Sequence, residues 1–154
     1  MTSTEPMARE VAATAAMLLD QGSSLDRLSR PLTVAALIGL LLAMALGGRE
    51  AVMVIAALAL VALAGIIEAY FAIRVGLDAA LFRHLATSEA ADPAALDGAL
   101  LRLRLMPETK AGRAALDRAV GARRLLHRQA AALIVQLGLV FLGAGLAAAG
   151  WLQR

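Results

Sequence analysis

Three long apolar stretches limit what this sequence can fold into: residues 32–48, 51–73 and 130–151. The first has no charged residue, the second has only Glu68, and the third is interrupted only by Gln136. A hydrocarbon core about 30 Å thick is crossed by about 20 apolar residues of α-helix. None of the stretches has the polar stripe of a soluble amphipathic helix. The sequence therefore predicts an all-α integral membrane protein with three transmembrane helices.

The composition agrees with this prediction. Apolar residues make up 60% of the 154 residues, whereas charged residues make up 18% and aromatic residues 3%. The chain has no cysteine, which excludes disulfides and thiolate metal sites. Lys110 is the only lysine among 15 basic residues. Richness in Arg, Ala and Gly is typical of GC-rich coding, so we expect a bacterial protein.

The first two spans, 32–48 and 51–73, are predicted to form a transmembrane hairpin. Gly47, Gly48, Arg49 and Glu50 leave room only for a tight connection between them. Pro31 precedes the first span, and proline is well tolerated at the first position of a helix. We therefore expect a helix to begin there. Residues 43–45 match a signal-peptide cleavage pattern, but the long, partly acidic segment before the span argues against cleavage.

The basic residues predict how the chain is oriented. Arg27 and Arg30 precede the first span, Arg49 is alone in the hairpin connection, and most of the others lie between the second and third spans. Loops rich in Arg and Lys stay in the cytoplasm. We expect a multi-pass protein of the bacterial inner membrane, with its N-terminus in the cytoplasm and its C-terminus in the periplasm.

The N-terminal segment has apolar residues at helical spacing, which predicts an amphipathic helix. The run Gly22-Ser23-Ser24 is expected to interrupt it, and Ser23 with Asp26 resembles a capping box. This helix is predicted to lie on the membrane surface or on the protein's own cytoplasmic region.

The segment between the second and third spans predicts a small cytoplasmic helical lobe. The second helix is expected to continue to about Ala86. Asp92 and Pro93 are typical of the start of a short helix, which Pro107 would end. A further helix is expected from about Thr109 into the third span. The predicted segments are an N-terminal amphipathic cytoplasmic segment (1–30), a transmembrane hairpin (31–75), a cytoplasmic lobe (76–129), and a third span with a short outer tail (130–154).

Glu68 is the most informative single residue. An ionisable side chain at the centre of a span costs about 2.5–3.5 kcal/mol by insertion scales. Arg74 is expected to mark the cytoplasmic boundary of the same span. Glu68 could be a proton or cation site or a link to another subunit, or a carboxylate near the interface that pairs with an arginine or a helix end.

Small residues lie beside Glu68 on the helix of the second span. Small side chains at helical spacing allow helices to pack closely in lipid. The seam is expected to lie within the three-helix bundle or, alternatively, between copies of the chain. Its residues are Gly65, Ala69, Ala72 and Gly76.

A basic lip precedes the third span: Arg118, Arg123, Arg124, His127 and Arg128. Such clusters fix the topology of a membrane protein and can attract anionic lipid head groups. No aromatic residues accompany them, so a nucleic-acid partner is not expected.

Motifs of catalysis and of cofactor binding are missing from the sequence. It has no phosphate-binding loop, no nucleotide-binding glycine pattern and no nucleophile elbow. The two histidines, His84 and His127, have no closely spaced ligand partners, so neither a metal nor another cofactor is expected. We expect the protein not to be an enzyme.

These patterns favour a non-catalytic accessory or scaffold subunit of a bacterial inner-membrane complex. It would act by helix packing and through its cytoplasmic lobe. Its expected partners are membrane lipids and another membrane protein or a second copy of the chain. One alternative is a homo-oligomeric channel or small transporter with Glu68 in a polar path, and a weaker one is an anionic-lipid-binding protein.

Overall fold

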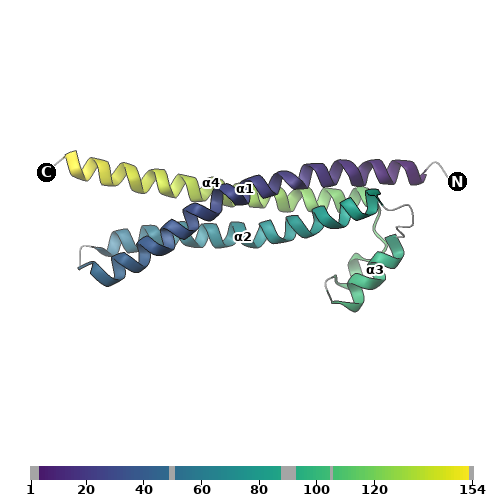
Figure 1. The fold of residues 1–154 in the computed structure, drawn as a ribbon, viewed down its shortest axis with the longest axis horizontal. Helices are drawn as coiled ribbons and strands as arrows, with labels where there is room; N and C mark the ends of the chain where they lie inside the picture. Colours follow the sequence, from purple (N-terminus) through teal and green to yellow (C-terminus); the bar gives the residue numbers. More distant parts are fainter. Residues whose placement is uncertain (1–3, 49–50, 88–92, 105, 153–154) are drawn as a thin grey trace. The chain divides into compact units, whose positions relative to one another are not determined.

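The computed structural model describes residues 4–48, 51–87, 93–104 and 106–152, and these residues form helices and short turns without a strand (Figure 1). The elements in chain order are α1 (Thr4–Leu46), α2 (Val52–Thr87), α3 (Pro93–Arg102), the 3-10 turn η2 (Glu108–Lys110) and α4 (Ala115–Leu152).

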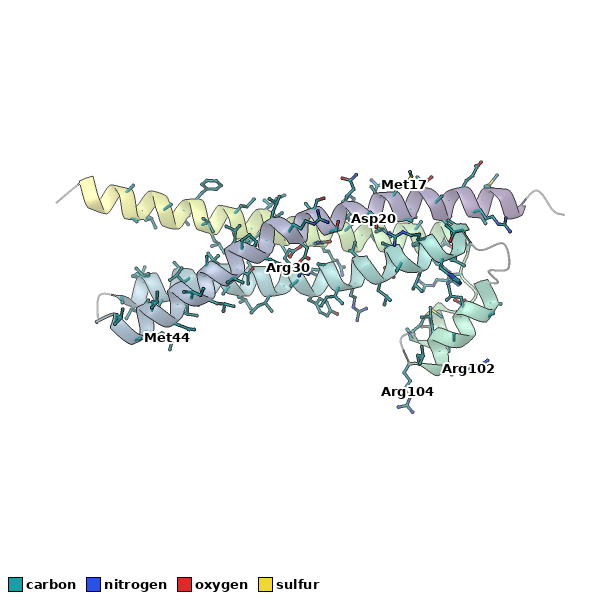
Figure 2. The ribbon with its side chains drawn as sticks, in the orientation of Figure 1. Met17, Asp20, Arg30, Met44, Arg102 and Arg104 are labelled. Carbon is teal, nitrogen blue, oxygen red and sulfur yellow. The ribbon has the colours of Figure 1, made fainter. Side chains whose placement is uncertain are left out.

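Three of these helices, α1, α2 and α4, are long and apolar enough to cross a membrane. They contain 43, 36 and 38 residues, whereas a span needs about 20. Their outward faces carry large apolar side chains that a soluble helix would bury, such as Met17 and Met44 of α1 (Figure 2). The all-α membrane fold predicted from the sequence is confirmed.

The predicted break before the first span is wrong, because α1 is one continuous helix. Residues Gly22-Ser23-Ser24 do not interrupt it, Ser23 and Asp26 do not cap a new helix, and Pro31 lies inside it. Proline lacks the N–H that would bond the carbonyl four residues earlier, which costs a helix about 3 kcal/mol. Tertiary contacts oppose that cost, since Gly22 and Ser29 are both buried against other helices.

The hairpin connection and the extension of α2 agree with the sequence. Helix α1 ends at Leu46 and α2 begins at Val52, so Gly47 and Gly48 lie in the connection, while Arg49 and Glu50 are outside the described residues. Helix α2 continues to Thr87, within one residue of the predicted end at Ala86.

The boundaries in the predicted lobe need correction. Helix α3 begins at Pro93 as predicted, although its expected cap Asp92 is outside the described residues. It ends at Arg102 rather than at Pro107, because Arg104 takes a left-handed conformation with φ 54°.

Helix α4 begins at Ala115, later than the predicted start near Thr109. A 3-10 turn and Gly112 intervene, and the φ of Gly112, 70°, belongs to the left-handed region that glycine adopts without strain.

The chain forms two compact units. Unit 1 combines Met1–Gln21 with Arg74–Leu125, and unit 2 combines Gly22–Ile73 with Leu126–Arg154. Each unit contains a portion of α1, α2 and α4, and unit 1 also contains α3. The predicted division into four segments stays a prediction.

The interiors of the two units are built from small apolar side chains. Unit 1 buries mainly alanines of α1 together with Leu19, Val75 and Phe82. Unit 2 has a cluster of Ala36, Val61 and Ala62. Small side chains let helix backbones approach closely, which is how helices associate in lipid.

Candidate functional site: a polar core among apolar helices

Gln129 of α4 joins three helices inside unit 2. Its Nε2 donates one hydrogen bond to the carbonyl oxygen of Gly22 on α1, at 2.8 Å, and another to Oε1 of Glu68 on α2, at 2.7 Å. The side chains of Gln129 and Glu68 are fully enclosed, with 0% exposure. The partner that the structure gives Glu68 is therefore a neutral amide on another helix.

Gln136 makes a second rung about two helical turns further along α4. The hydroxyl of Ser29 donates to Gln136 Oε1 at 2.7 Å, and Gln136 Nε2 donates to Oγ1 of Thr33 at 2.9 Å. The Thr33 hydroxyl in turn donates to the carbonyl of Ser29 at 2.9 Å. We call Ser29, Thr33, Glu68, Gln129 and Gln136 the polar core. In lipid, such bonds between helices are worth about 0.6 kcal/mol on average and up to about 1.7 kcal/mol.

Gly65 allows α1 and α4 to meet α2 at the second rung. A Cβ atom at this position would overlap the Thr33 hydroxyl and would lie 2.6 Å from Nε2 of Gln136. Only glycine fits there without moving the hydrogen-bonded side chains. The requirement comes from this close approach and not from the backbone conformation, which is helical.

The four residues of the predicted seam differ in their exposure. Gly65 is buried in the polar core, and Ala69 and Ala72 are half-buried. Gly76 is exposed, and a Cβ there would meet nothing within 4 Å. Arg74, which was expected to mark the boundary of the span, is also exposed.

The residues of the predicted basic lip also differ in their surroundings. Arg118 is bound to Asp97, whereas Arg123, Arg124, His127 and Arg128 are exposed on α4.

Asp97 and Arg118 form a clamp between α3 and α4 in unit 1. Arg118 donates from Nη1 to Asp97 Oδ1 at 2.7 Å and from Nη2 to Oδ2 at 2.5 Å, and the Gly112 N–H donates to Oδ2 at 2.9 Å. The Asp97 side chain is 6% exposed. The hydrogen bonds from Arg118 lower the pKa of Asp97 below its ordinary value, against the opposing effect of burial. The clamp holds the turn after α3 and the start of α4 together.

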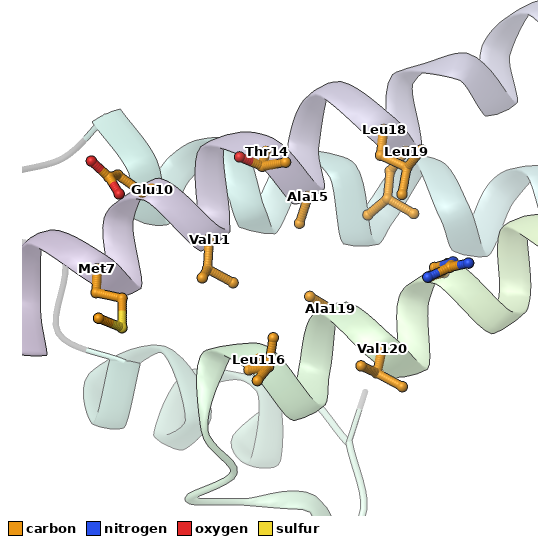
Figure 3. A pocket seen from close by; sticks show the side chains of 11 residues that line it. Met7, Glu10, Val11, Thr14, Ala15, Leu18, Leu19, Leu116, Ala119 and Val120 are labelled. Atoms are coloured by element: carbon orange, nitrogen blue, oxygen red, sulfur yellow. The ribbon is translucent and has the colours of Figure 1, made fainter.

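An apolar groove lies between α1 and α4 in unit 1. Its walls are residues of α1 from Met7 to Leu19 and of α4 from Leu116 to Arg123, and its volume is about 420 Å³. Val11 and Ala119 point into it from opposite helices, whereas Glu10 lies at its rim (Figure 3).

A metal centre finds no support in the portion of the chain that the structure describes. Within it, no group of three or more His, Cys, Asp or Glu residues is close enough to hold a metal ion.

The fold and the polar core define an all-helical protein that has three helices able to span a membrane and polar side chains that bond to one another between those helices. No known protein family matches the chain, and neither the curated proteins nor the solved structures contain a match.

Proposed function

We propose that this chain is a non-catalytic accessory or scaffold subunit of a bacterial inner-membrane complex. It packs its helices in the bilayer and docks an amphipathic helix of a partner membrane protein in the apolar groove. The observation that carries the proposal is the groove, an apolar surface in the unit that holds most of the charged residues between the second and third spans.

The size and lining of the groove suit a helix. Met7 and Leu116, on opposite walls, are 66% and 63% exposed. An exposed apolar patch of this kind is typical of an interaction site. At 1.5 Å per residue, the wall from Met7 to Leu19 is roughly 18 Å long, which corresponds to about three turns of a partner helix. The cavity has room for apolar side chains of that helix.

The charges around the groove suggest the chemistry of the partner. Glu10 and Arg123 have opposite charges and both line the groove, whose remaining lining is apolar apart from Thr14. A complementary helix would present apolar side chains to the groove, a basic residue toward Glu10 and an acidic residue toward Arg123. Complementary charges of this kind fix the register of a partner more than they add affinity.

The polar core supports a structural rather than a chemical role for the spans. Its side chains donate to and accept from one another, and they lie inside the helices of one chain. A channel made of several copies would need Glu68 to face a shared path. The Glu68 side chain is instead fully enclosed within one chain, so we rank that function second. A lipid-binding role would place an acyl chain in the groove and a head group at Arg123.

Photo-crosslinking tests the proposed function. A photoreactive amino acid replaces Leu116 in the full chain in its native membrane, and the adduct is identified by mass spectrometry. We expect a peptide from an amphipathic helix of a membrane protein, with charges complementary to Glu10 and Arg123. An adduct with lipid alone, or with another copy of this chain, would contradict the proposal.

A pair of variants controls for the groove. Ala119→Phe fills the groove, whereas Ala13→Phe puts the same side chain on an exposed position of α1 that does not line it. We expect the adduct to disappear with Ala119→Phe and to persist with Ala13→Phe. Equal adduct yields in the two variants would show that the partner does not occupy the groove.

A further inference from the structure

The described portion of unit 2 has a shortage of hydrogen-bond donors. Among the described residues, three buried side-chain atoms have no hydrogen-bond partner: Asp26 Oδ1, Glu68 Oε2 and Gln129 Oε1. All three are oxygens, and they come from α1, α2 and α4. Buried polar atoms are normally bonded, and an unmet acceptor costs about 1–3 kcal/mol.

The surroundings of Glu68 do not favour a negative charge. Its side chain has no exposed surface, and its hydrogen-bond partner on α4, Gln129, is neutral. On α1, Arg30 is near enough to interact electrostatically with Glu68, but its stronger interactions are with Asp26. The Arg30 side chain is 72% exposed and bonds to Asp26 at 2.6 Å, so solvent screening and that carboxylate weaken its effect on Glu68. An isolated carboxylate in an apolar interior is costly and is avoided by taking up a proton.

Further titratable and charged side chains lie on the helices that carry Glu68 and Gln129. On α2, Arg74 follows Glu68 but is exposed; on α4, His127 and Arg128 precede Gln129 and are also exposed.

We propose that Glu68 is a proton-binding site, and that its neutral carboxyl group joins α2 to α4 through Gln129. The carboxylate takes up one proton on Oε2, no other bond forms or breaks, and the side chain becomes a neutral acid. Oε2 is then a donor, and Gln129 Oε1 is an unpartnered acceptor on the amide that already donates to Glu68 Oε1. A protonated acid and a primary amide are complementary, because each can offer the other one donor and one acceptor. One proton would satisfy two of the three unpartnered oxygens.

A proton suits this site better than a metal cation does. Gln129 Nε2 directs an N–H at Glu68, and a donor next to a cation is unfavourable. The described residues also contain no group of three acidic or histidine ligands. This proposal rests on unit 2 and does not depend on the proposed function of the groove in unit 1.

Infrared spectroscopy of the purified full chain in lipid bilayers tests the proposal. We expect the C=O band of a protonated carboxyl group at neutral pH, which shifts when water is replaced by D2O. The band should be lost in Glu68→Gln and kept in Glu108→Gln, a control at an exposed position. A spectrum at neutral pH that contains only carboxylate bands would overturn the proposal.

The stability of two variants gives a second readout. Glu68→Gln replaces the O–H donor with an N–H donor, so we expect it to melt close to wild type. Glu68→Leu leaves Gln129 bonded to the Gly22 carbonyl alone and should melt lower. Equal losses in both variants would overturn the neutral pair. If Glu68→Gln does not fold, Glu68→Asp keeps the acid and should move the infrared band rather than remove it. A band that stays unchanged in Glu68→Asp belongs to another residue and refutes the assignment.

Discussion

Replacing Gln136 with leucine removes the second rung of the polar core while keeping a side chain of similar size. Two hydrogen bonds between helices are lost, one from the Ser29 hydroxyl and one to the Thr33 hydroxyl. Thr33 keeps its donor bond to the Ser29 carbonyl, so only Ser29 is left with an unmet hydroxyl donor. The variant therefore tests how much the rung contributes to holding α1 against α4.

The structure sets the size of the expected effect. Bonds between membrane helices contribute about 0.6 kcal/mol on average and at most about 1.7 kcal/mol, so the loss of two lowers the free energy of unfolding by about 1–3 kcal/mol. Burial of the leucine gives little in return, since lipid tails are as apolar as the bundle interior.

Equilibrium unfolding in mixed micelles, followed by circular dichroism, measures this change. The matched control is Gln21→Leu, which makes the same substitution at an exposed position of α1 and should stay within about 0.5 kcal/mol of wild type. A double-mutant cycle with Ser29→Ala should give a coupling of about 0.6–1.7 kcal/mol. The reasoning is refuted if Gln136→Leu costs no more than Gln21→Leu, or if the coupling is zero.

Two further predictions concern Gly65 and the clamp of unit 1. Gly65→Ala should lower the unfolding free energy in the same assay by about 1–3 kcal/mol, because its Cβ overlaps the Thr33 hydroxyl. The control Gly138→Ala places a Cβ that meets nothing within 4 Å, so it should be neutral or stabilising. Equal effects of the two substitutions would exclude the close approach at Gly65. Arg118 lowers the pKa of Asp97, so the clamp should stabilise the fold above the ordinary pKa of aspartate, about 3.9, and be lost as the pH falls through the lowered pKa. Arg118→Leu should therefore weaken hydrogen-exchange protection of the α3 amides by about 1.5–3 kcal/mol at pH 7. The difference from wild type should shrink in acid, and a difference that does not change with pH would contradict this prediction.

Hydropathy and local turn signals were sufficient for much of the fold. The three apolar stretches, the glycine connection after Leu46 and the start of α3 at Pro93 each depend on short-range physics that a sequence displays directly. Prediction from the sequence failed where a local signal competes with contacts between residues far apart in the chain. Residues Gly22-Ser23-Ser24 and Pro31 are typical of a helix break, yet α1 continues through them because partners on α4 bond to Gly22 and Ser29.

The candidate site was likewise only partly predictable from the sequence. Glu68 was apparent from the sequence as the one charge in an apolar span, but its partner is 61 positions away, and nothing local connects the two. Gln129 sits at the edge of an apolar stretch, where a polar residue is ordinary. The spacing of Gln129 and Gln136 on one face of α4 was the available signal. The pairing of Asp97 with Arg118 depends on the turn after α3, whose left-handed residues Arg104 and Gly112 the sequence did not indicate.

The most direct test of the polar core is a solid-state NMR contact between Glu68 and Gln129 in bilayers. The full chain carries 13C-labelled glutamate and 15N-labelled glutamine side chains and is diluted in an excess of unlabelled chains. We expect a cross-peak between the Glu68 carboxyl carbon and the Gln129 amide nitrogen, consistent with the 2.7 Å hydrogen bond, that survives dilution and is lost in Gln129→Leu. A missing cross-peak, or one that disappears on dilution because it joins two chains, would contradict a polar core held within one chain.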